Sequence, residues 1–449
     1  MMARGRRCLI ASNCFGVIAA NIVGLHFATV VALKMGASPA YIGALSAIHL
    51  CSTAMQLLTM QQMQRRGKRR NLIIFQSLAA LAFSGLVFLP DVWDRWQAAH
   101  PGWPLAYFMA VAGTRHICNG LAMTGWMPLL QDNVSDQQCG RFFGRMRTLV
   151  QCVMLLWMVV LSIWVGRDVP WSVIRLVFGL GVILSILRAC CLMPVHERPP
   201  VGESRPLGEM LWGPFRDRDF RWVLVYIVSY GVAIGLAEPF RAVYLKELDS
   251  PDWLLLMGPA TVFLGGMVTL TGWGRLVDRW GNRACFSISH IGMMVSLFGW
   301  LLIDAGTVGF VLTFVFFFLA GVFNGGNSIA QTNYLMGVVG PQQQAAYFAV
   351  TTTLSIAAIG IAGLVGGFLL RWLEDVVISQ GALSLNAYQL VFLLSGLLFA
   401  VPHAVRGRLR HGKEISSAEV ITFILRPVRM TLGVLAAAAN TARHSDDDE

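Results

Sequence analysis

The chain has 449 residues, of which 56% are hydrophobic and only 13% are charged. A soluble domain carries about 25% charged residues, so a soluble fold of this length could not hide so much apolar surface. The composition therefore excludes an ordinary soluble protein and predicts an all-α polytopic membrane protein. The net charge of +11 raises the question of nucleic-acid binding, which depends on where the basic residues lie.

A membrane-spanning helix needs about 20 predominantly apolar residues. The first apolar run follows Arg4, Arg6 and Arg7, as in a signal peptide, but it is long and lacks a convincing cleavage site of small residues. We therefore expect it to be the first transmembrane helix. In chain order, twelve spans are predicted, near residues 8–33, 39–62, 71–90, 103–130, 148–166, 171–194, 222–245, 253–273, 284–304, 307–335, 344–370 and 387–405.

Lysine and arginine are distributed unevenly over the loops between these spans. Twenty-six of the 35 lie on the side that carries both termini, and five lie in the opposite loops. The positive-inside rule then predicts a multi-pass protein of a bacterial inner membrane, with both termini in the cytoplasm. Because the basic residues are spread over six loops, we expect membrane lipids around the protein and no nucleic-acid partner.

The longest internal connection divides the predicted spans into two sets of six. Residues 1–195 form the first half, residues 196–221 a cytoplasmic linker rich in Pro, Arg and Glu, and residues 222–405 the second half. Residues 406–449 form a tail, in which 420–438 is either an amphipathic helix on the membrane surface or a frayed end.

The two halves repeat each other in sequence. Residues 134–149 match 339–354 at six of sixteen positions with an offset of 205, which also carries Asn119 to Asn324. Leu33-Lys34 recurs at an offset of 212, and the basic loop 65–69 recurs at 279–283 with an offset of 214. These matches predict two pseudo-symmetric six-helix bundles of like orientation, with a ligand site at the midplane between them.

The loop between the eighth and ninth spans carries a motif that resembles the G-x-x-x-D-R-x-G-x-R/K signature of the major facilitator superfamily. The resemblance implies that family's fold, transport by alternating access, and a conformational latch in this loop. In the first-half copy, Gln64 replaces the acidic residue and Met60 the leading glycine. The second-half copy is complete, with Gly274, Asp278, Arg279, Gly281 and Arg283.

Ionisable residues within spans are costly and mark a pathway by default. Arg115 lies about 18 Å into the fourth span. It is either a ligand or coupling residue or a member of a structural ion pair. Its neighbour His116 is interpreted as structural, His49 is a weak candidate, and Arg188 is expected to extend to the cytoplasmic surface.

By the offset of 212, Glu238 in the seventh span corresponds to His26 in the first. A carboxylate and an imidazole can share a proton, which suits symport. The equal alternative is an outer-gate salt bridge between Glu238 and Arg241 or His26. Neutral candidates for ligand contact are Asn21, Asn324 and Asn327, although such groups often serve helix packing.

The sequence contains no phosphate loop, nucleophile constellation or metal-ligand spacing, so we expect neither an enzyme nor a cofactor or bound metal. The leading hypothesis is a secondary transporter that moves a small anionic or zwitterionic solute, either driven by a gradient of H⁺ or Na⁺ or in facilitated movement. We expect it to be a monomer. The alternative is an assembly factor on the same fold with little or no transport.

Overall fold

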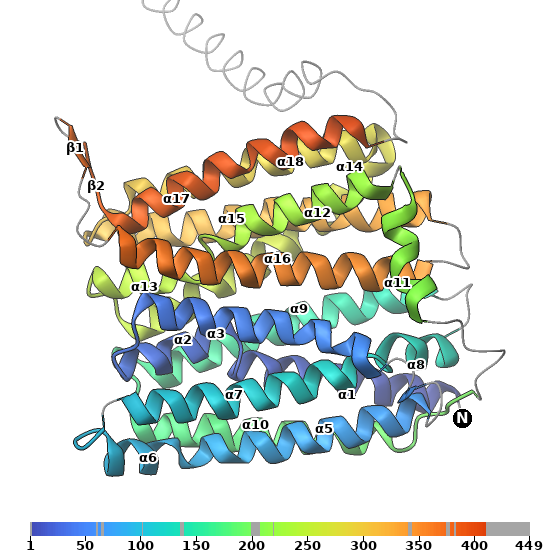
Figure 1. The fold of residues 1–449 in the computed structure, drawn as a ribbon, viewed down its shortest axis with the longest axis horizontal. Coiled ribbons are helices and arrows are strands. Elements are labelled where there is room, and N and C mark those ends of the chain that lie inside the picture. The colour runs from blue at the N-terminus through green and yellow to red at the C-terminus, as the bar shows by residue number, and fades with distance from the viewer. Residues whose placement is uncertain are drawn as a thin grey trace, which may run out of the picture.

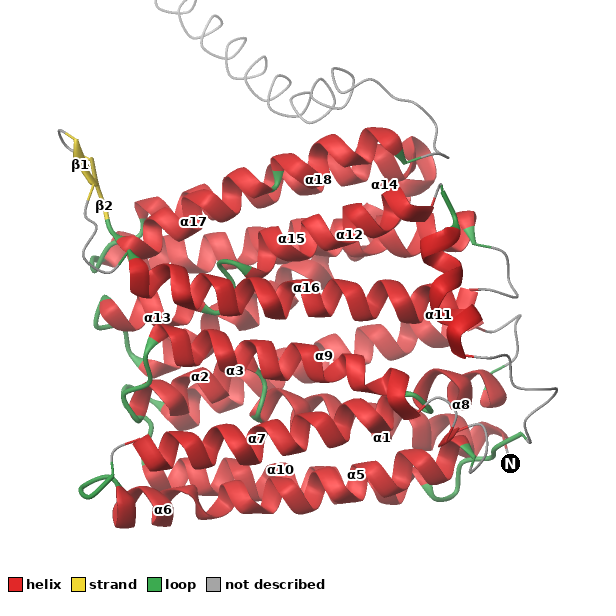
Figure 2. Cartoon of the chain, in the orientation of Figure 1, coloured by secondary structure: helices red, strands yellow, loops and turns green. Residues whose placement is uncertain are grey.

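The computed structural model describes residues 2–59, 62–63, 67–100, 102–134, 139–198, 207–218, 220–339, 344–373, 378–380 and 383–409. The predicted tail beyond residue 409, the replaced motif positions Met60 and Gln64, and most of the linker therefore lie outside the described residues. Figure 2 shows that helices make up nearly all of the described chain, with one short antiparallel hairpin.

The first half of the chain forms paired and single helices that run back and forth. Proline and glycine mark several of their ends: Ser38 caps the helix that starts at Pro39, and Gly36 takes a φ of 76° in the turn before it. The elements are α1 (Met2–Ile22), α2 (Leu25–Lys34), α3 (Pro39–Cys51), η1 (Ser52–Thr59), α5 (Lys68–Ser84), η2 (Gly85–Phe88), α6 (Leu89–Trp96), α7 (Gly102–Met123), α8 (Trp126–Asn133), α9 (Cys139–Val165) and α10 (Trp171–Leu192).

The second half follows the same course after a short helix in the linker. Asn386 and Gln389 form a capping box at the start of its last long helix. The elements are α11 (Leu207–Arg216), α12 (Phe220–Gly235), α13 (Phe240–Glu247), α14 (Asp252–Gly299), η4 (Trp300–Leu302), α15 (Thr307–Val338), α16 (Gln344–Trp372), β1 (Ile378–Gln380), β2 (Leu383–Leu385), α17 (Ala387–Leu398), α18 (Ala400–Val405) and η5 (Arg406–Arg408).

Nine helices among the described residues are long and apolar enough to cross a membrane. One of them, 252–302, turns back on itself at Gly281, whose φ of 79° interrupts α14, so it supplies the predicted eighth and ninth spans. A count of twelve requires that the interrupted segments 39–59 and 102–133 also cross. Helix α9 begins at Cys139, nine residues before the predicted start of the fifth span.

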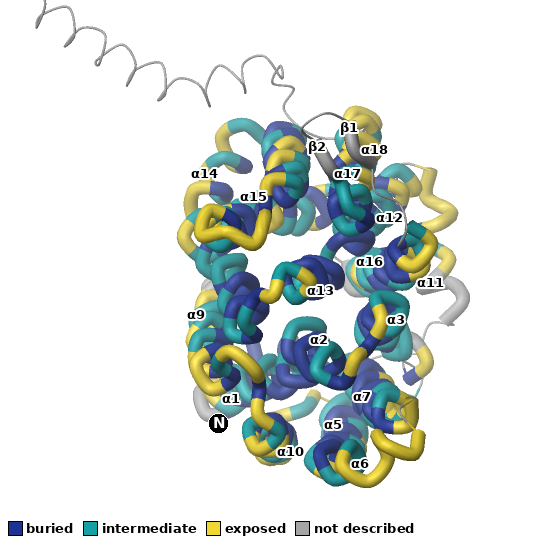
Figure 3. The backbone as a smooth tube through the Cα atoms, turned by 90° about the vertical axis from the view of Figure 1, so that its left-hand side faces the viewer, coloured by how far each residue is buried: buried dark blue, intermediate teal, exposed yellow. Residues whose placement is uncertain are grey.

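The helices lie side by side in two bundles (Figure 1). One end of the molecule carries the N-terminus, α8 and α11, and we call it the linker side. The opposite end carries α6, α13 and the β1–β2 hairpin, and we call it the hairpin side. Seen along the helices, α2 and α13 occupy the centre between the bundles (Figure 3).

The bundles meet along two helix pairs, α3 with α16 and α9 with α14. The first pair is packed backbone to backbone: a Cβ atom added to Gly43 would lie 2.6 Å from the carbonyl oxygen of Gly363. Glycine is needed there because any side chain would force the two halves apart.

Equivalent capping contacts support the repeat. Arg69 donates to the carbonyls of Met193 and Val195 at the end of the first half. With the same offset of 214, Arg283 donates to the carbonyls of Gly407 and Leu409 at the end of the second half. Both arginines follow a glycine of positive φ, so the basic loops turn and cap in the same way.

Candidate functional site

The first spanning segments of the two halves are broken at equivalent places. Helix α1 ends at Ile22 and α2 starts at Leu25, while α12 ends at Gly235 and α13 starts at Phe240. The offset of 212 carries Gly24 to Leu236, inside the second break. Paired interruptions of this kind mark binding sites in transport proteins, because irregular backbone within a membrane is tolerated where it lines a cavity or is buried in protein.

The structure brings His26, Glu238 and Arg241 together at these breaks. All three line one small cavity between α2, α13 and the start of α14, with space of about 10 Å³, enough for about one water molecule. An ion pair joins Arg241 Nη1 to Glu238 Oε2 at 2.8 Å. His26 lies near enough to both charges to interact with them electrostatically.

Arg241 is almost completely buried, with 3% of its side chain exposed, whereas Glu238 keeps 26%. The guanidinium lies over the rings of Trp300 and Phe317, at 5.5 and 5.7 Å from their centroids. Cation–π contacts and the single carboxylate therefore hold the charge. Arg241 Nε and Nη2 have no hydrogen-bond partner among the described residues.

Arg115 lies inside the N-terminal bundle. Its guanidinium is 5.3 Å from the ring centroid of Phe83, and Nη1 is 3.5 Å from His116 Nδ1. It pairs with no carboxylate among the described residues, so the alternative of a structural ion pair gains no support from this arrangement.

The expectation that Arg188 reaches the cytoplasmic surface is wrong. Its side chain is buried, donates to Asn119 Oδ1 at 3.3 Å and repels Arg115. Gly16 makes room for it, because a Cβ at that position would lie 2.7 Å from the guanidinium carbon. Asn119 also accepts from Gln76, so the two arginines share a polar interior that contains no carboxylate among the described side chains.

Two histidines connect Arg115 to the break in the first span. His116 Nε2 lies 2.9 Å from the carbonyl oxygen of Val23, and His116 Nδ1 lies 3.2 Å from His49 Nδ1. The break between α1 and α2 frees the Val23 carbonyl from the regular helical pattern, and the imidazole satisfies it.

The three candidate asparagines differ in their surroundings. Asn21 comes just before the first break, and its buried Oδ1 has no partner in the described part of the chain. Asn324 and Asn327 instead accept hydrogen bonds from Tyr230 and Tyr226, at 3.0 and 2.5 Å. Asn21 Oδ1 is therefore unpaired within the described residues, while the other two asparagines are hydrogen-bonded within the C-terminal bundle.

The halves are joined across the hairpin side by a cluster that sequence reasoning missed, which we call the Asp252 clamp. Asp252 Oδ2 accepts from Val169 N at 3.0 Å, and the same residue's N–H donates to Arg167 O at 3.0 Å. Trp253 N donates to Gly166 O at 2.9 Å. These bonds link the loop between α9 and α10 to the start of α14.

Comparison with known proteins decides the family. The sequence profile of the Major Facilitator Superfamily matches residues 9–363, well over half of the chain. The chain belongs to the Major Facilitator Superfamily.

Solved transporters of this superfamily share the fold. The nucleoside transporter NupG superposes with a TM-score of 0.65 at 12% identity, covering 92% of this chain and 99% of that one. The D-xylose-proton symporter gives 0.66 at 14% identity, with 88% and 96% covered. A bacterial homologue of the iron transporter ferroportin, in its inward-facing state, gives 0.66 at 12% identity, with 92% and 100% covered.

Among curated proteins, the putative sugar transporter ERD6-like 13 of Arabidopsis thaliana is 25% identical over 192 residues. The match includes 43% of this chain and 36% of the relative, so the chain spans about a third of the relative's length. Family and solved neighbours agree on a multi-pass membrane protein with the fold of this transporter superfamily.

The superfamily signature lies on the linker side. Asp278 and Arg279 are exposed there, and Asp278 has no ion-pair partner within the described residues. Gly281 supplies the turn between the two spans, and Arg283 caps the end of the second half, while a Cβ at Gly274 would meet open space. The motif residues therefore turn the chain and cap the end of the second half. The contacts given above for Gly281 and Arg283 lie within that half and do not join the two halves.

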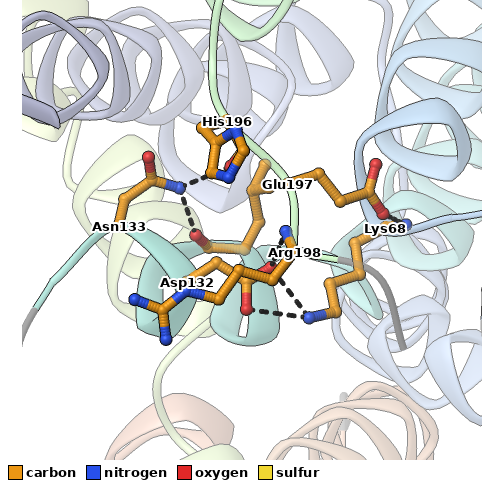
Figure 4. A network of polar contacts seen from close by, with 7 residues as sticks. Lys68, Asp132, Asn133, His196, Glu197 and Arg198 are labelled. Carbon is orange, nitrogen blue, oxygen red and sulfur yellow. Dashed lines mark hydrogen bonds and ion pairs between the residues drawn. The ribbon is translucent and has the colours of Figure 1, made fainter. Parts of the chain in front are cut away.

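A polar network fastens the start of the linker to the N-terminal bundle (Figure 4). Lys68 Nζ contacts both carboxylate oxygens of Asp132, at 2.9 and 2.8 Å, and its backbone N–H donates to Glu197. Arg198 N donates to Asp132, and Asn133 Nδ2 donates to His196 O at 2.8 Å. Sequence reasoning missed this network, although an isolated acid at the end of α8 beside a basic loop could have indicated it.

Proposed function

We propose that this protein is a secondary active transporter that moves a small anionic or zwitterionic solute by alternating access, coupled to protons. The observation that carries the proposal is the paired break in the first and seventh spans, with His26 and Glu238 at equivalent positions beside it. A partly buried carboxylate and a partly buried imidazole between two moving bundles can bind a proton in one arrangement and release it in another.

The contacts between the bundles support an arrangement closed on the hairpin side. The Asp252 clamp and the Gly43–Gly363 approach both lie there. With both termini in the cytoplasm of a bacterial inner membrane, as the charge distribution predicts, the closed hairpin side faces away from the cytoplasm.

We assign the two moving bodies to residues 1–195 and 222–405, acting within one monomer. The linker network holds residues 196–198 to the first body. Rocking of two bodies about a fixed midplane site is the usual route of alternating access in folds of this design.

The solute class follows from uncompensated charge. Arg115 and Arg188 place two buried guanidiniums in the N-terminal bundle without a carboxylate partner among the described residues. Buried cations are costly unless they are paired, so a solute with a carboxylate, phosphate or similar group would relieve that cost. Arg guanidinium groups also suit such anions geometrically.

In the proposed proton coupling, the carboxylate of Glu238 exchanges its ion pair with Arg241 for a bound proton. In the present arrangement Arg241 occupies the carboxylate. A proton on Glu238 weakens that ion pair and leaves Arg241 with its contacts to Trp300 and Phe317. Loss of the pair loosens α13 beside the break, so protonation and movement are linked. Sodium is the alternative coupling ion.

The test is uptake by proteoliposomes from a panel of labelled organic anions and zwitterions. We expect accumulation of at least one anionic compound, reduced by Arg115→Ala. Arg175→Ala is the matched control, because that arginine forms only a half-exposed ion pair with Asp91. Uptake that is unchanged by Arg115→Ala removes Arg115 from the mechanism. Deletion of residues 414–449 distinguishes a transporter from the alternative, an assembly factor. In this variant transport should persist, whereas an assembly function that uses the tail should fail.

A further inference from the structure

The hydrogen positions on His49 and His116 follow from their neighbours. A backbone carbonyl can only accept, so His116 Nε2, 2.9 Å from Val23 O, carries a hydrogen. A guanidinium can only donate, so His116 Nδ1, which Arg115 Nη1 approaches at 3.5 Å, presents a lone pair. His49 Nδ1, 3.2 Å from the same nitrogen, must then carry a hydrogen.

The remaining basic nitrogen of the pair is His49 Nε2. It has no hydrogen-bond partner among the described residues, and His49 is partly exposed whereas His116 is buried. A proton added to the pair therefore binds at His49 Nε2. The resulting imidazolium still donates through Nδ1 to His116, and charge makes that hydrogen bond stronger.

We propose that His49 and His116 form a second proton-binding site, in which His49 Nε2 binds the proton and His116 transmits its effect to the broken first span. This inference rests on the proposed function, since it assigns part of proton coupling to these residues. The chain His49–His116–Val23 ties α3 and α7 to the gap between α1 and α2. Protonation of His49 strengthens its hydrogen bond to His116, so it favours the arrangement in which His116 is bonded to the Val23 carbonyl at the break.

The helices around His49 carry other charged and titratable groups. Helix α7 presents Arg115 and His116, and α2 presents His26, which interacts electrostatically with His49. Cys51 follows on α3 itself, while the titratable side chains of α16, Tyr347 and Arg371, lie near its ends. Beyond His26 lie Glu238 and Arg241.

Arg115 gives the site its link to the solute. Its positive charge repels a proton on His49, and a bound anion near Arg115 would cancel that repulsion. Proton and anion then assist each other's binding, and by thermodynamic reciprocity the effect is equal in both directions. Coupling of this kind is symport without direct contact between the two cargoes.

The test is solid-state NMR of the full-length protein with ¹⁵N-labelled histidine in lipid bilayers, titrated from pH 8 to pH 3.5. We expect His49 to give a neutral imidazole signal with its hydrogen on Nδ1, and this signal to convert to the cation on acidification. His49→Asn should abolish this signal, because the Asn amide keeps a donor near the Nδ1 position but has no second basic nitrogen. His100→Gln is the matched control, since His100 is exposed beside Trp96 and Trp103.

Arg115→Gln should raise the proton affinity of the same signal, on the order of tenfold, by removing the repulsion. The proposal is overturned if the Nδ1–H signal persists in His49→Asn, or if no signal lost in that variant titrates in this range. It is also overturned if Arg115→Gln leaves the titration unchanged. The NMR titration needs no solute, so its outcome is independent of the transport assay. A wild-type protein that fails to transport would refute the proposed function without deciding whether His49 binds a proton.

Discussion

The Asp252 clamp gives a quantitative prediction about how firmly the hairpin side is closed. Its carboxylate is 4% exposed and accepts from Val169 N across the two bundles, while Lys246 Nζ lies 2.7 Å from its other oxygen. Hydrogen bonds to charged groups contribute about 1.5–3 kcal/mol each. Asp252→Ala removes the acceptor for Val169 and keeps the two backbone bonds to residues 166 and 167. Opening of this side should therefore become roughly 10- to 150-fold more frequent.

Hydrogen exchange measured by mass spectrometry on the reconstituted protein reads this change directly. The amides of Val169, Asp252 and Trp253 are the donors of the clamp, so their protection reports its opening. Asp168→Asn is the matched control: it breaks an ion pair with Lys34 whose carboxylate is 73% exposed, which is worth less than about 1 kcal/mol. Unchanged exchange at 166–169 in Asp252→Ala would refute the assignment of Asp252 to closure.

Three further substitutions test packing between the bundles and the repeated caps. Gly43→Ala should lower the free energy of unfolding by about 1–3 kcal/mol, because the added methyl group forces α3 away from α16. The measurement is the unfolding temperature, which should fall in this variant and not in the control Gly179→Ala, whose added Cβ meets open space. Equal effects of the two substitutions would contradict the close approach. Arg69→Gln should speed hydrogen exchange at the end of α10 and leave exchange at residues 407–409 unchanged. Arg283→Gln should speed exchange at residues 407–409 and leave the end of α10 unchanged. Faster exchange at both places in either variant would contradict separate caps.

Hydrophobic runs and short internal matches were enough to predict a helical membrane fold of two related bundles. The offset of 214 paired Gly67 with Gly281 and Arg69 with Arg283. Their roles in turning the chain and capping the two halves were not predicted, since the motif was interpreted as a latch. Boundaries were less predictable. Helix α9 continues through polar residues from Cys139, since helical hydrogen bonding does not end where the apolar core of the membrane does.

The candidate site was predicted in part. The offset of 212 paired His26 with Glu238, and both line one cavity with Arg241. The burial of Arg188 was not predictable from its place near the end of α10, because it depends on space at Gly16 in a distant helix. The contacts of His116 and Asp252 likewise depend on segments far away in the chain, Val23 and Val169, which no local pattern reveals.

The most direct test of the account is solute accumulation driven by a pH gradient, compared between wild type and Glu238→Gln in proteoliposomes. The probe is the organic anion that wild type takes up from the panel. A permanently neutral side chain cannot exchange a proton or pair with Arg241, so we expect accumulation to be lost while solute exchange without a gradient persists. Accumulation by Glu238→Gln equal to that of wild type would contradict proton coupling through this residue.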